Sequence, residues 1–153
     1  MIRPTPLPHK PVAFLAHSFA ENDTDVVATI KKALRAAGWS VVTGEAAAPQ
    51  SVSDKVRARI ATAHLFVALF TRRHKIGAGC WTTTPWVIEE KAYSLGTDPR
   101  RPIVLLVEHG IPTPGETGGL NGDLEFIQFD RCRLDIAVGS LRAMLHSVAM
   151  LLR

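Results

Sequence analysis

The chain has 153 residues, enough for one domain with a substantial core and too few for two. Apolar residues make up 46% and charged residues 21%, a balance typical of globular domains and unlike that of disordered chains. The net charge of +4 comes from basic residues scattered along the chain, which favours solvated helix faces over a nucleic-acid groove. We therefore expect no direct nucleic-acid partner, although a slightly positive cleft would suit an anionic ligand.

Cysteine usage and the N-terminus indicate the compartment. Cys80 and Cys132 show neither metal-ligand spacing nor a disulfide framework, so we expect free thiols and no metal site. Free thiols are typical of a reducing compartment. The N-terminus lacks the pattern of a signal peptide, and no apolar run approaches membrane-spanning length. These features predict a cytoplasmic protein without a membrane partner.

Apolar runs alternate with segments at helical spacing after a proline-rich lead-in, residues 1–10. The folded domain is expected to span residues 11–153. The first of these runs, residues 11–16, is short and continuously apolar, which suits a strand that is buried on both faces. The expected strands are 11–16, 39–43, 64–70, 102–107 and 124–129.

The segments between the strands have helical spacing and recognisable ends. Pro85 suits the first position of a helix, where no N–H is needed. A loop is expected over residues 71–83, and the final helix over residues 134–152 repeats apolar residues in steps of three and four. Caps are expected at residues 21–23, Ser51 and Thr84, and helix stops at Gly38 and Gly96.

This alternation predicts an α/β protein: a five-stranded parallel sheet with helices on both faces, a flavodoxin-like three-layer sandwich. Right-handed crossovers favour the strand order 2-1-3-4-5, with a ligand crevice at the carboxyl ends of the first and third strands. Residues 17–19, 71–73 and the helix that begins at Pro85 should border this crevice. A phosphoacceptor receiver of this fold would carry an aspartate where the chain has Phe70-Thr71.

Trp86 and Glu90 are four residues apart, so they lie on one face of the expected helix. A carboxylate beside an indole is partly shielded from water, an arrangement that suits the stabilisation of a developing positive charge. Such a pair alone more often consists of a core Trp and a solvated Glu. Its place beside the crevice favours a catalytic role for Glu90, whereas Glu89 should point elsewhere into solvent.

Further substrate-binding candidates lie at the ends of strands. His17 and Ser18 are neighbours without a third member, so a nucleophilic pair is disfavoured; they either bind ligand hydroxyls or phosphate, or simply end the strand. Phe19 either stacks on a base or packs under its loop. Arg72 either pairs with phosphate or stays exposed. Glu45, after the second strand, completes this set of candidates.

Residues 13–19 (Ala-Phe-Leu-Ala-His-Ser-Phe), residues 37–42 (Ala-Gly-Trp-Ser-Val-Val) and the Trp86/Glu90 pair together resemble bacterial TIR (Toll/interleukin-1 receptor-like) domains. The resemblance runs from about Val12 to Leu152, and the family has the strand order inferred above. It implies NAD hydrolysis, in which the bond between nicotinamide and ribose is cleaved to give ADP-ribose or a cyclic isomer. NAD is then the substrate, and no cofactor is expected.

By this resemblance Glu90 takes the position of the catalytic glutamate and Trp86 that of its partner. Residues 44–50 correspond to the family's BB loop, which often contacts a neighbouring subunit. That loop commonly carries Pro-Gly, and here it reads Pro49-Gln50. The resemblance implies homo-oligomerisation through TIR–TIR contacts, a fused or partner sensor domain, and a role as an effector in bacterial antiphage defence.

Two alternatives remain open from the sequence. One is a non-enzymatic TIR module that signals through TIR–TIR contacts. The other is an enzyme similar to nucleoside deoxyribosyltransferases, which share the sheet and use a glutamate on ribosides. The sequence does not distinguish the product, the activating trigger or the geometry of the oligomer.

Overall fold

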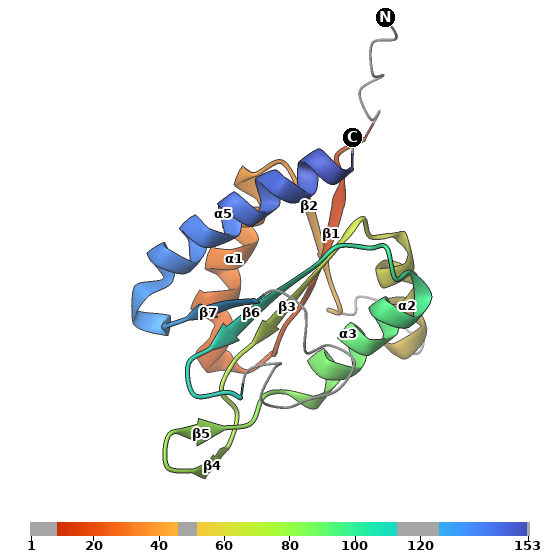
Figure 1. Cartoon of the computed structure of the whole chain (residues 1–153). Coiled ribbons are helices and arrows are strands. Elements are labelled where there is room, and N and C mark those ends of the chain that lie inside the picture. Colours follow the sequence, from red (N-terminus) through yellow and green to blue (C-terminus); the bar gives the residue numbers. More distant parts are fainter. Residues whose placement is uncertain (1–8, 46–51, 113–125, 153) are drawn as a thin grey trace, which may run out of the picture.

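The protein, described by a computed structural model over residues 9–45, 52–112 and 126–152, is built on one parallel sheet (Figure 1). The strand order is β2-β1-β3-β6-β7, which confirms the expected flavodoxin-like order because β4 and β5 belong to a separate hairpin. The strands are β1 (Val12–Ala16), β2 (Ser40–Thr43), β3 (Leu65–Phe70), β6 (Ile103–Glu108) and β7 (Phe126–Phe129).

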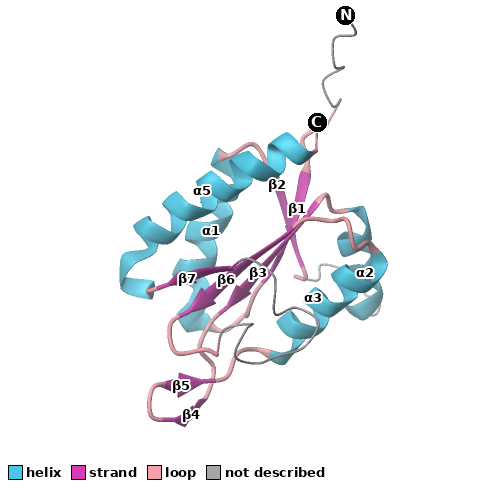
Figure 2. Cartoon of the chain, viewed as in Figure 1, coloured by secondary structure: helices cyan, strands magenta, loops and turns pink. Residues whose placement is uncertain are grey.

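Among the described residues, helices cover both faces of the sheet (Figure 2). Helices α1 (Thr24–Ala36) and α5 (Leu134–Leu151) pack on one face, where Leu15 and Val67 point. Helices α2 (Val52–Thr62) and α3 (Pro85–Thr97) pack on the other, where the rings of Phe14 and Phe66 stack with centroids 5.6 Å apart. Because adjacent residues of a strand point to opposite faces, a continuously apolar strand serves both layers.

The ends of the strands meet at one edge and fix where a ligand can bind. Ala16 at the end of β1 pairs with Ala68 in β3, so the segments that follow these two strands begin side by side. The 3₁₀ turn η1 (Glu21–Asp23) leads from this edge into α1, and η2 (Arg131–Arg133) leads from β7 into α5. This edge is the predicted switch point.

Two sequence predictions about local structure were wrong. The expected loop over residues 71–83 contains an antiparallel hairpin, β4 (Lys75–Gly77) and β5 (Cys80–Trp81). Helix α3 continues one residue beyond the predicted stop at Gly96 and ends at Thr97. It ends there because the next residue, Asp98, precedes a proline and has an extended backbone. The predicted cap at Ser51 and the first residues of the predicted strand 124–129 lie outside the described residues.

The stretch from η2 through α5 is long and apolar enough, by length and composition, to cross a membrane. In the structure Ala137, Leu141 and Leu145 are buried in the cluster that α5 shares with α1 and the sheet. One face of α5 therefore packs into the core of the domain, and 22% of the apolar window as a whole is buried.

Candidate active site

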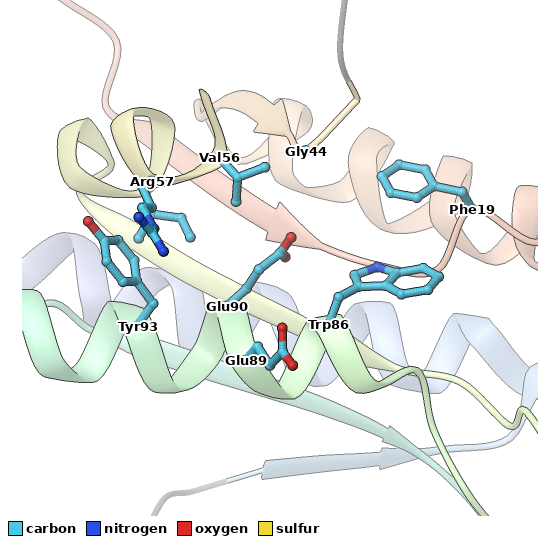
Figure 3. Close-up of a pocket in the computed structure, with 9 residues that line it drawn as sticks. Phe19, Gly44, Val56, Arg57, Trp86, Glu89, Glu90 and Tyr93 are labelled. Carbon is cyan, nitrogen blue, oxygen red and sulfur yellow. The ribbon is translucent and has the colours of Figure 1, made fainter. Parts of the chain in front are cut away.

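A cavity of about 560 Å³ opens between α2 and α3 at the carboxyl edge of the sheet (Figure 3). Its volume is in the range of small-molecule sites. Phe19 follows β1 and Gly44 follows β2, so the ends of two strands contribute to it directly. The lining residues are Phe19, Gly44, Val56, Arg57, Ile60, Trp86, Glu89, Glu90 and Tyr93.

Glu90 is half-buried on α3, and its carboxylate reaches into the middle of this cavity (Figure 3). Burial, together with the nearby charge of Glu89, raises the pKa of Glu90 to about 7. Among the described residues, no cation forms an ion pair with this carboxylate. Glu90 is therefore a desolvated acid that exchanges its proton near neutral pH.

Trp86 and Phe19 form an aromatic wall beside Glu90. Their rings are nearly parallel, with centroids 6.1 Å apart and 17° between the planes. The indole Nε1 donates a hydrogen bond of 3.2 Å to the backbone oxygen of His17, which fixes the ring relative to the end of β1. Trp86 is 36% and Phe19 50% exposed, so both rings retain surface for a ligand.

His17 and Ser18 lie behind this wall rather than on the cavity surface. Both are buried, and Ser18 Oγ accepts a hydrogen bond of 3.0 Å from the backbone N–H of Ala20, so it organises the turn that carries Phe19. The His17 ring meets Phe19 edge-on with centroids 4.8 Å apart. Burial lowers the pKa of His17 and favours its neutral form. The structure thus places both as supports of Phe19.

Arg72 and Glu45, the other two predicted substrate-binding residues, lie outside the cavity. Arg72 lines a second cavity of about 360 Å³, where its guanidinium lies 5.6 Å from the ring centroid of Trp81 and its Nε donates to the backbone oxygen of His109. Trp81 belongs to the hairpin that the sequence did not reveal. Glu45 is exposed, with its carboxylate 3.9 Å from Lys31 Nζ.

Six of the nine lining residues were not predicted as site residues from the sequence, and three of these six have polar side chains. Tyr93 follows Glu90 by three positions and Trp86 by seven, so helical spacing was sufficient to find it. Glu89 is exposed as expected, yet it also lines the cavity, which corrects the prediction that it points elsewhere. Arg57 adjoins the buried Val56 on α2, and only the packing of α2 against α3 brings it here.

Behind the cavity, Arg131 joins two buried carboxylates from distant parts of the chain. Its Nη2 lies 2.9 Å from Asp23 Oδ1 and 2.8 Å from Glu108 Oε2. Asp23 also accepts a 2.7 Å hydrogen bond from the hydroxyl of Thr71. Asp23 was expected to cap α1, but its side chain makes no capping bond and is committed to this network instead. The network anchors η1 and, through it, the turn that carries Phe19.

Within residues 9–45, 52–112 and 126–152, no group of three or more His, Cys, Asp or Glu side chains has an arrangement that could hold a metal ion. Cys80 and Cys132 are free cysteines. The polar and aromatic groups that line the cavity are the carboxylates of Glu89 and Glu90, the Arg57 guanidinium and the rings of Phe19, Trp86 and Tyr93.

A family model described as TIR domain matches residues 16–138. The chain therefore belongs to the TIR domain family, a class in agreement with its sheet order and with the position of the Trp86/Glu90 pair. A search of curated protein sequences found no significant match.

Solved structures with the same fold include a CMP N-glycosidase from Clostridium botulinum, with TM-score 0.53, 15% identity and coverage of 82% of this chain and 98% of that one. A response regulator receiver protein from Sinorhizobium medicae aligns with TM-score 0.46 and 17% identity over 89% and 97% of the two chains. A diflavin flavoprotein from Nostoc sp. aligns with TM-score 0.49 and 10% identity over 95% and 99%. At these identities the similarity concerns the fold alone.

Proposed function

We propose that this TIR domain is an NAD⁺ glycohydrolase or cyclase that cleaves the bond between nicotinamide and ribose. The observation that carries the proposal is the placement of Glu90, a partly desolvated carboxylate directed into a ligand-sized cavity beside the exposed Phe19/Trp86 wall. Membership of the TIR family makes NAD the expected substrate, and no cofactor is required.

The reaction follows from the charge of the substrate. Nicotinamide in NAD⁺ carries a positive charge, so when the C1′–N bond breaks, the bonding electrons pass to nitrogen and neutral nicotinamide leaves without a proton. The ribose becomes oxocarbenium-like, and an ionised carboxylate close to it stabilises that charge, as carboxylates do in glycosidases. Water then adds to C1′ and loses a proton, giving ADP-ribose; capture by the substrate's own adenine gives a cyclic isomer.

The raised pKa of Glu90 fits this role. Desolvation disfavours the ionised form of Glu90 when no ligand is bound. A bound cation restores the ionised form, because opposite charges attract more strongly where water is excluded. The same desolvation strengthens the interaction with the developing ribosyl cation. Trp86 limits the access of water to one side of the carboxylate and so bears on the ratio of cyclic to hydrolysed product.

We also propose the cellular role that the family implies: a cytoplasmic effector of antiphage defence that becomes active by self-assembly, with a fused or partner sensor domain. The open cavity supports this proposal, because Phe19 and Trp86 remain exposed in the single chain and a neighbouring copy would shield them. Shielding would raise the electrostatic effect of Glu90 by excluding water.

The test is incubation of concentrated protein with NAD⁺, followed by separation of nicotinamide and the ribose-containing products by chromatography. Glu90→Gln keeps the size of the side chain and removes its charge, so cleavage should fall by on the order of 10² or more. Glu21→Gln, which removes an exposed charge from η1, is the matched control and should retain activity. Assembly is followed in parallel by light scattering.

Two outcomes would replace the proposal. Cleavage absent from the wild type, or unchanged in Glu90→Gln with assembly intact, would favour a non-enzymatic interaction module. Parallel incubations with CMP and with deoxynucleosides test the remaining alternative, since the shared fold includes a CMP N-glycosidase. Release of base from these compounds and not from NAD⁺ would indicate a nucleotide N-glycosidase or a deoxyribosyltransferase-like enzyme.

A further inference from the structure

The cavity has two chemically different ends, and Glu90 lies between them (Figure 3). One end is formed by the stacked rings of Phe19 and Trp86. The other is formed by Arg57 from α2 and Tyr93 from α3, with the guanidinium carbon 5.9 Å from the centroid of the tyrosine ring. The cavity is therefore polarised along its length, from an uncharged aromatic surface to a cation.

Within the described residues, the Arg57 guanidinium approaches an aromatic ring but pairs with no polar group. Among the described residues it makes no ion pair and no hydrogen bond, and its one contact is the cation–π approach to Tyr93. Arg59, two positions further along α2, differs in this respect because its Nη1 donates to the backbone oxygens of Thr43 and Glu45. One arginine holds the end of β2 in place, while the other keeps its donors available.

Arg57 also does not neutralise the catalytic carboxylate. Burial and Glu89 raise the pKa of Glu90, and no attraction from Arg57 opposes them. The charges of Arg57 and Glu90 are therefore available to different parts of a ligand. An arginine with free donors, held by an aromatic ring beside a cavity, has the geometry that binds phosphate through paired hydrogen bonds.

We propose that Arg57 binds the 5′-phosphate of the nucleotide substrate, with the ribose at Glu90 and the departing base against Phe19 and Trp86. In a nucleotide the base is attached to C1′ of the ribose and the 5′-phosphate is carried by C4′ through C5′, on the other side of the ring oxygen. The ribose therefore lies between base and phosphate, as Glu90 lies between the two ends of the cavity (Figure 3). The identity of the base in this assignment rests on the proposed function. The binding of phosphate by Arg57 does not depend on which reaction the site performs.

The first test compares three substrates that share the scissile bond: NAD⁺, nicotinamide mononucleotide and nicotinamide riboside, the last of which has no phosphate. Arg57→Gln should raise KM for the two phosphorylated substrates about tenfold or more, because a hydrogen bond to a charged group is lost, and should change kcat/KM for the riboside less than twofold. Arg57→Lys, which restores the charge without the paired donors, should recover part of the loss.

Arg142→Gln is the charge-matched control, since Arg142 is exposed on α5 and lines neither of the two cavities described above. It should leave all three substrates unchanged. An equal loss of kcat/KM for the riboside and the phosphorylated substrates in Arg57→Gln would overturn the assignment, and so would no loss for any of them.

A binding experiment separates this inference from the proposed reaction. Nicotinamide mononucleotide and nicotinamide riboside, and likewise CMP and cytidine, are titrated calorimetrically into the Glu90→Gln protein with and without Arg57→Gln. Tighter binding of either nucleotide than of its nucleoside, abolished by the second substitution, supports the phosphate site even if NAD⁺ is never cleaved. Equal binding of nucleotide and nucleoside in both pairs refutes it.

Discussion

A Cβ atom added to Gly44 would stand 3.5 Å from Glu90 Oε1 and 3.4 Å from Val56 Cγ2. The backbone after β2 therefore approaches the carboxylate as closely as a methyl group permits. This contact ties the predicted catalytic residue on α3 to the loop that begins at Gly44.

Gly44→Ala tests the importance of this contact. The added methyl group makes ordinary van der Waals contacts and does not require a left-handed backbone, so the free energy of unfolding should change by less than about 1 kcal/mol. The methyl group displaces water and substrate from one side of the Glu90 carboxylate, and NAD⁺ cleavage should fall about tenfold or more. Thermal unfolding and nicotinamide release measure the two effects.

A large loss of thermal stability in Gly44→Ala would show instead that the turn cannot accept a Cβ atom. Gly139→Ala provides the comparison, because a Cβ at that exposed position of α5 meets no atom within 4 Å. It should leave activity unchanged and should stabilise the helix slightly, since alanine is the better helix former.

Glu90→Gln should stabilise the protein in a pH-dependent way. The pKa of Glu90 is raised by folding from 4.5 to about 7, so between these values the folded state binds more protons than the unfolded state and stability falls as pH rises. Glu90→Gln has no titratable group at this position, so its free energy of unfolding does not fall in this way. Its advantage should be absent near pH 4.5 and grow to about 1–2 kcal/mol above pH 7, a figure reduced from the full shift because the side chain is partly solvated.

Urea unfolding at pH 5, 6, 7 and 8 measures this advantage without reference to any substrate. A constant difference between wild type and variant across these pH values would mean that the carboxylate is solvated, and the electrostatic basis of the proposed site would fail. Glu21→Gln, at an exposed position of η1, is the reference for the effect of losing one surface charge.

The rate of NAD⁺ cleavage should depend on pH through the same group. The ionised form of Glu90 stabilises the ribosyl cation, so kcat/KM should rise with pH and level off above about 7, the pKa of the free protein. For kcat the midpoint should lie lower, because bound nicotinamide is cationic and favours the carboxylate. Initial rates between pH 5 and 9 give both curves, and a kcat/KM profile that is flat across pH 7 would contradict the assignment.

The network around Arg131 should be more important for stability than its surface location suggests. Arg131→Gln would leave the carboxylates of Asp23 and Glu108 buried without their cation, and breaking such a pair typically costs about 3–5 kcal/mol. Chemical denaturation measures this loss. Arg133→Gln removes an arginine two positions away that pairs with Asp135 entirely at the surface, and no measurable loss is expected there.

The central strands β1, β3 and β6 could be predicted from the sequence because they are buried on both faces. Runs such as Leu65–Phe70 have no polar position, and nothing other than a covered strand of this length suits them. The extent of α3 was harder to predict because glycine is only weakly unfavourable inside a helix, so Gly96 did not end it. The stronger signal was Pro99, whose ring restricts the residue before it.

The part of the site that lies on the single helix α3 could be predicted from the sequence. Trp86 and Glu90 lie on the same face of α3, as spacing requires, and Tyr93 follows the same rule. Arg72 lies outside the cavity, beside Trp81 in a hairpin whose strands of three and two residues are too short to show an apolar alternation. The position of Arg57 beside the cavity depends on how α2 packs against α3, and a local sequence pattern does not predict that packing.

The hydrogen bond between the Trp86 indole and the backbone of His17 joins two positions 69 residues apart. During synthesis, a chain that has emerged from the ribosome only as far as β2 contains Phe19, but it does not yet contain Trp86 or Glu90. After α3 has emerged, Trp86 and Phe19 come together only when β1 has paired within the sheet. If the domain cleaves NAD⁺ as proposed, an incomplete chain therefore has no assembled site for the reaction, and activity arises only when the whole domain has folded.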